Sequence, residues 1–132
     1  MKTINHFLTE RLKISKNTKV KLDTDEGICH MIFDYFKNMY DTGFDNSEER
    51  DDWFEDFHVI PDEYTQQTLD SLEDKNQISD ERIKEIGDDQ KTFNKFVDFC
   101  IEAAEHFLYT PNEKFNFDYI YKEIFKIKND NT

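Results

Sequence analysis

Glycine and proline are scarce in this chain, with 3 Gly and 2 Pro among 132 residues. Strand-like alternation of polar and apolar residues is also scarce, and the dominant apolar spacing follows the 3.6-residue period of a helix. The sequence therefore predicts an all-α fold, a compact bundle of about five or six helices in one domain.

Long apolar runs are absent, so no segment is expected to cross a bilayer. No apolar stretch precedes a small-residue cleavage site, so no secretory signal is expected. Cysteine is limited to Cys29 and Cys100, which fall within helical apolar patterns. We expect two buried free thiols in a reducing cytosol, with a disulfide as the alternative.

Motifs that carry chemistry are missing as well. The chain has no glycine-rich phosphate loop, and its four histidines lie on four separate segments without zinc spacing. A calcium loop starting at Asp23 would need Gly at its sixth position and Glu at its twelfth, but Gly27 is fifth and Asp34 is twelfth. Cys29 and His30 are neighbours that point about 100° apart on a helix. We therefore expect no enzyme, no catalytic residue, no metal and no cofactor.

Positive charge is lacking where negative charge is densest. Residues 45–89 hold 17 acidic and 4 basic residues, and so carry the whole net charge of -13. The other residues balance to zero. This distribution argues against direct binding of nucleic acid or of an anionic membrane, because both need a basic footprint. It favours a basic protein partner.

The first 22 residues differ from the rest by being basic, with six Lys or Arg against one acid, Glu10. Thr3 is a plausible cap for a helix that ends at about Lys13. One face of that predicted helix carries Ile4, Phe7, Leu8 and Leu12. We expect residues 1–22 to form a separable basic appendage to an acidic helical domain at 23–132. The alternative is that its apolar face docks on the acidic body.

The segment after this helix contains the core Leu12, Lys13, Ile14, Ser15, Lys16 and Asn17. With the residues before it, this core resembles an N-terminal segment that recurs on small proteins of tailed bacteriophages, including the crAss-like phages of gut Bacteroidetes. The resemblance covers only the start of the chain, and the remainder resembles no family. It implies a viral or prophage origin, and hence the cytoplasm of a host cell or a virion, but no activity.

The remaining apolar pattern predicts helices at about 25–41, 47–58, 62–74, 79–89, 89–109 and 116–128. Thr24 or Asp23, Asn46 or Ser47, and Ser79 are the expected caps, Pro61 opens a helix, and Gly43 and Gly87 end two others. The helices at 25–41 and 89–109 are expected at the centre. The last segment also alternates like a strand, but its length and the all-α context favour a helix.

The acidic block supplies the candidate binding site. Its partner-binding carboxylates are predicted to be Glu48, Asp52, Glu55, Asp56, Asp62, Glu63, Asp70, Glu73, Asp74, Glu81 and Glu85. Trp53 and Phe57 stand among them and have two interpretations. They form an aromatic anchor for a partner, or they belong with Phe54 to the inward face of a helix.

The resulting hypothesis is a non-catalytic accessory protein that binds a basic protein partner. In this view it imitates nucleic acid and inhibits a nucleic-acid-binding or defence protein of the host. A structural or packaged virion protein is the alternative. Glu102 and Glu105 resemble half of the magnesium site of all-α nucleotide pyrophosphohydrolases, which would imply an enzyme. The second acidic pair of that family belongs on a later helix, where this chain has none, so a solvated helix face is favoured.

Overall fold

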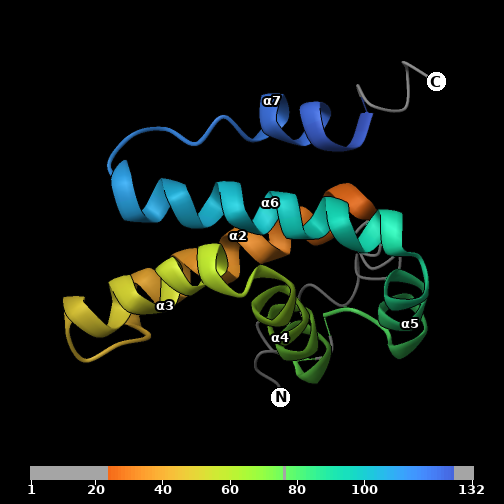
Figure 1. Cartoon of the computed structure of the whole chain (residues 1–132), viewed down its shortest axis with the longest axis horizontal. Helices are drawn as coiled ribbons and strands as arrows, with labels where there is room; N and C mark the ends of the chain where they lie inside the picture. The colour runs from red at the N-terminus through yellow and green to blue at the C-terminus, as the bar shows by residue number, and fades with distance from the viewer. Residues whose placement is uncertain (1–23, 76, 127–132) are drawn as a thin grey trace, which may run out of the picture.

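The computed structural model describes residues 24–75 and 77–126, shown in colour in Figure 1. The predicted basic appendage lies outside the described residues. In the described part the chain forms helices and no strand, which confirms the all-α prediction. The elements are α2 (Asp25–Thr42), α3 (Ser47–Val59), α4 (Pro61–Asp74), α5 (Asp80–Asp88), α6 (Gln90–Tyr109), α7 (Phe117–Tyr121) and the π-helical turn η1 (Lys122–Lys126).

Helix starts are set by short polar side chains that accept from free backbone N–H groups. Thr24 accepts from the Gly27 amide at 3.0 Å, and Asn46 accepts from the Glu49 amide at 2.8 Å. Ser79 caps α5 in the same way. α2 ends at Thr42, just before the predicted stop Gly43. A Cβ on Gly43 would lie only 2.8 Å from the Met39 carbonyl oxygen. Glycine alone fits this close approach.

One predicted helix end is wrong. Gly87 does not end its helix, because α5 continues to Asp88 and a side chain at Gly87 would meet no neighbouring atom. The end comes instead from Asp89, which turns away to cap α6 with its own carboxylate. The last segment is helical, as favoured, but it changes from α to π geometry at Lys122. Its expected extension beyond residue 126 lies outside the described residues.

Helix α6 is the centre of the fold. In Figure 1 it runs across the molecule, with α7 on one side, α3 and α4 on the other, and α2 crossing behind it. The sequence pattern predicted one buried face, but Phe99 and Ala103 are also fully buried. The reason is the cover from α7: the Phe99 ring lies 5.5 Å from the ring of Phe117. A helix enclosed on two sides buries more than one stripe.

A group of aromatic rings joins α2, α3 and α6. The fully buried ring of Phe36 lies 5.6 Å from Trp53, 5.7 Å from Phe54 and 4.9 Å from Phe57, measured between centroids. Phe54 continues the contact to Phe107 of α6 at 5.5 Å. These separations are those of favourable tilted and edge-to-face pairs. The rings therefore fix the acidic helix α3 to the core.

Both cysteines are free and fully buried, which confirms that part of the prediction. Burial raises the pKa of the Cys100 thiol to about 12 and holds that of Cys29 well above its usual value. The Thr65 hydroxyl opposes the rise at Cys100 slightly, but its oxygen is buried without a hydrogen bond of normal geometry. Because their pKa values are raised, both thiols are neutral core side chains. Nucleophilic attack and metal binding need the thiolate, which burial disfavours at both positions.

Replacing Phe36 by Ala should remove the ring on which α3 packs. Loss of a fully buried Phe side chain costs about 3–5 kcal/mol, a large part of the roughly 5–15 kcal/mol that stabilises a typical domain. We expect the urea midpoint to fall accordingly. The control Val59→Ala, at a side chain that is 71% exposed, should change it little. Equal effects of the two substitutions would contradict this account of the core.

Candidate functional site: an acidic face on α3, α4 and α5

Helices α3, α4 and α5 follow one another along the long axis of the molecule, on the side of α6 opposite α7 (Figure 1). They carry all eleven predicted partner-binding carboxylates. Nine of these side chains are exposed, and only Asp56 and Glu73 are half-buried. We call this set of eleven carboxylates the acidic face.

The part of the acidic face on α3 is a regular row. Glu48, Asp52 and Glu55 are spaced by four and then three residues, so they share one side of the helix. Phe54 and Phe57, on the other side, are fully buried. Because Phe54 and Phe57 pack into the core, the carboxylate row on the other side of α3 faces solvent, and this packing fixes its orientation.

The two interpretations of the aromatic residues are resolved by burial. Phe57 has no exposed surface, so its predicted role as a partner anchor is wrong. Trp53 is half-buried and packs against the Phe57 ring at 5.2 Å, as expected for an inward helix face. The exposed apolar residues on this side are instead Val59 and Ile60, at the junction of α3 and α4. The sequence analysis did not identify them. The available signal was their position, because neither residue continues the apolar spacing of the inward face of α3.

Neutralising cations are few on this face. Of the block's basic residues, Arg50 pairs with Asp51 and covers the Tyr40 ring, at 3.1 and 4.2 Å respectively. Lys75 lies over the Tyr35 ring. Among the described residues, Glu85 is the one member of the acidic face in a salt bridge, with Arg82 at 3.1 Å. The negative charge of the face is thus left largely uncompensated.

Two members of the acidic face have a local structural task. Asp56 accepts a hydrogen bond from the Tyr64 hydroxyl at 2.8 Å and so ties α3 to α4. This bond is the main reason why the pKa of Tyr64 is raised. Asp70 accepts from the Gln66 side chain one turn earlier, at 3.0 Å. The other carboxylates depend less on such bonds and are better placed to meet a partner.

Carboxylates crowd where α4 meets α5. The pKa of Glu73 is raised, first by a hydrogen bond with Asp80 and then by slight desolvation and the charges of Asp80, Asp70 and Asp74. A raised pKa means that the folded protein disfavours the ionised form of Glu73. This point is therefore the clearest sign of unrelieved negative potential on the acidic face.

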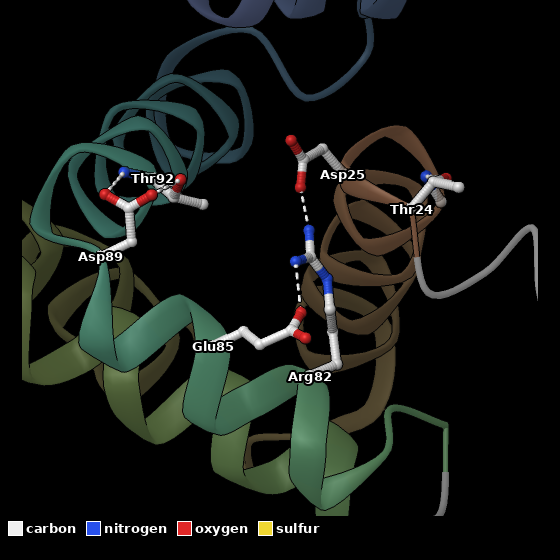
Figure 2. Close-up of polar contacts among 7 residues, drawn as sticks. Thr24, Asp25, Arg82, Glu85, Asp89 and Thr92 are labelled. Atoms are coloured by element: carbon white, nitrogen blue, oxygen red, sulfur yellow. Dashed lines mark hydrogen bonds and ion pairs between the residues drawn. The ribbon is translucent and has the colours of Figure 1, made fainter.

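One arginine holds α5 against the start of α2. Figure 2 shows the Arg82 guanidinium between the carboxylates of Asp25 on α2 and Glu85 on its own helix. Its side chain is only 21% exposed. α5 is a short helix with one fully buried residue, Ile86, so apolar packing alone holds it weakly. The ion pair of Arg82 with Asp25 therefore helps to hold α5 against α2.

The Glu102 and Glu105 pair lies on α6. Glu105 is 3.6 Å from His58 Nε2. Within the described ranges, no group of three or more His, Cys, Asp or Glu side chains is placed to hold a metal ion.

Comparison with protein-family models, curated proteins and solved structures found no match to this chain. In the described part, no helix has the length and apolar character needed to cross a membrane. The function must therefore be argued from the acidic face and the remaining surface features.

Replacing Glu73 by Gln should make the protein more stable at pH 7. A carboxyl with a raised folded-state pKa binds its proton more tightly in the folded state, so its contribution to stability falls as pH rises through that pKa. The gain in melting temperature should be largest at pH 7 and shrink below pH 4. Glu55→Gln removes the same charge from α3 and serves as control. A pH-independent effect of Glu73→Gln would refute the crowding argument.

Replacing Arg82 by Gln should loosen α5 without unfolding α6. Loss of a partly exposed, charge-assisted bridge costs about 1–2 kcal/mol. Hydrogen exchange of the α5 amides should become about tenfold faster, while the amides of α6 keep their protection. Lys84→Gln, an exposed change on the same helix, should leave the α5 amides unchanged. Equal acceleration by both variants would show that the bridge does not anchor α5.

Proposed function

We propose that this chain is a non-catalytic binding protein whose acidic face occupies a basic groove of a protein partner. That groove is one that otherwise holds nucleic acid, so the chain acts as a nucleic-acid mimic. The partner class we favour is a nucleic-acid-binding or defence protein of a phage host. The observation that carries the proposal is the uncompensated charge of the acidic face, in which only Glu85 forms a salt bridge among the described residues.

The spacing of the charges supports imitation of a nucleic-acid strand. With a rise of about 1.5 Å per residue, Glu48, Asp52 and Glu55 span about 10 Å, or one charge per roughly 5 Å. A DNA strand carries one phosphate per about 3.4 Å. The row on α3 is thus somewhat sparser than a strand, and α4 and α5 extend the charge along the same axis of the molecule (Figure 1).

Crowding at Glu73 adds an energetic reason for binding. The pKa of Glu73 is raised first by a hydrogen bond with Asp80 and then also by repulsion from the charges of Asp80, Asp70 and Asp74. Lys or Arg side chains of a partner would relieve it and would release counterions as they bind. Exposed Val59 and Ile60, at the junction of α3 and α4, would add apolar contact.

The phage connection rests on the first residues alone. The resemblance of the segment around residues 12–17 to the N-terminal segment of small phage proteins supports a viral origin. A phage protein of this charge fits a role against host proteins that grip nucleic acid, because such proteins present the basic grooves that an acidic surface needs.

The proposal is tested by capturing partners from host lysate and competing them off with duplex DNA or RNA. The captured protein should be basic, should be displaced by nucleic acid, and should bind with an affinity that falls steeply as salt rises. A variant with four carboxylates of the acidic face replaced by Ser should bind at least a hundredfold more weakly. The four replaced residues are Asp52, Glu55, Asp70 and Glu73.

A matched variant removes the same charge from exposed carboxylates elsewhere. Its four Ser substitutions are at Asp34, Asp41, Glu113 and Asp118. Because net charge alone changes equally in both variants, this one should keep at least a tenth of the original affinity. If the two variants weaken binding alike, or if nucleic acid does not compete, the acidic face is not a mimic of nucleic acid.

A further inference from the structure

A groove lies between α6 and the α7–η1 segment, on the side of α6 away from α4 and α5 (Figure 1). It consists of two adjoining hollows of about 330 and 390 Å³ that share Glu102 and Ile120. Each hollow has the volume of a small ligand pocket, but together they follow α6 from Asp98 to Tyr109. Their shape therefore suits an extended occupant better than a compact one.

The floor of the groove is apolar. Ile101 and Ile120 are half-buried there, and Ile124 is buried. Tyr119 and Tyr109 stand at the rim with 59% and 65% of their surface exposed. They are two of the four exposed large hydrophobic residues in the described part of the chain. Apolar surface gathered along one groove is typical of a contact site.

The walls of the groove are mainly acidic, although Lys114 also lines it. Asp98, Glu102 and Glu105 follow one side of α6, and Glu123 faces them from η1. The pKa of Glu102 is raised by partial burial and then by the charges of Glu105 and Asp98. An occupant must therefore combine an apolar stripe with positive charge.

We infer that the groove holds the chain's own basic N-terminal segment, residues 2–22. This segment carries six Lys or Arg against one acid, so its charge complements the acidic walls. Its apolar residues recur at helical spacing and so can cover the apolar floor. These residues are Ile4, Phe7, Leu8 and Leu12. A tethered segment also has a high effective concentration at the groove, which a separate partner lacks.

The lengths agree with this assignment. Residues 98–109 of α6 span about 16 Å, and a helix over residues 3–13 would span about 15 Å. The ten residues 14–23 can bridge up to about 33 Å when extended. Helix α2, which follows the tether, packs against α7, since the His30 ring stacks on the Phe117 ring at 3.7 Å. The tether is thus long enough.

One charge pair gives the assignment a specific register. Arg11 follows Phe7 by four residues and Leu8 by three, so it shares their face of the helix. We place Arg11 against Glu102, because this carboxylate lines both hollows of the groove. This assignment does not depend on the proposed function, because no residue of the groove belongs to the acidic face.

Hydrogen exchange of the full chain at low salt tests this inference. The amides of residues 5–12 should exchange at least tenfold more slowly than unprotected amides of the same sequence. Glu102→Lys and Arg11→Glu should each remove most of this protection. The double variant Arg11→Glu with Glu102→Lys should restore it, since the reversed pair is again complementary.

Asp52→Lys is the matched control, because it reverses one charge on the acidic face instead of in the groove. It should leave the protection of residues 5–12 unchanged. The amides of α2 and α4 report in every variant whether the fold is intact, and Glu123→Lys replaces Glu102→Lys if that variant unfolds.

Three results would overturn the inference. The first is the absence of protection at residues 5–12 in the unaltered chain. The second is protection that Asp52→Lys removes and Glu102→Lys does not, which would put the segment on the acidic face. The third is protection that grows with protein concentration, which would assign the groove to the segment of a second copy.

Discussion

The packing of Phe36 against Trp53, Phe54 and Phe57 is the contact on which the acidic face depends. Helix α3 has six acidic residues among 13, and repulsion between such neighbours costs roughly 0.2–0.5 kcal/mol per pair. Burial of one aromatic side chain removes roughly 150–250 Å² from water, worth about 4–6 kcal/mol at 25 cal/mol per Å². Two buried rings therefore outweigh the repulsion, and the helix can present its carboxylates outward.

Local signals in the sequence were enough for the helices and most of their starts. Thr24, Asn46 and Ser79 cap where predicted, because the interaction that defines a cap reaches only three residues along the chain. Gly87 misled because glycine permits a helix end without requiring one. The end of α5 is set by the competing demand of Asp89 as the cap of α6, which only the next helix reveals.

Burial was predicted less well than helix content, and for a non-local reason. The pattern of α6 shows one apolar stripe, but Phe99 and Ala103 are also buried because α7 returns over them. The exposure of the carboxylates on the acidic face could be predicted from residue type alone, since a charged side chain without a buried partner stays in solvent. That Phe57 is unavailable, and that Val59 and Ile60 are exposed instead, follows from how α3 meets α2.

The two sides of α6 offer different kinds of recognition. The acidic face has much charge, so attraction to it is long-ranged and weakened by salt. The groove beside α7 has fewer carboxylates over an apolar floor, so binding there gains from burial that salt does not screen. A basic amphipathic segment is therefore better held in the groove than on the acidic face. Sequestering that segment would also keep its six cations from neutralising the surface that a basic partner must meet.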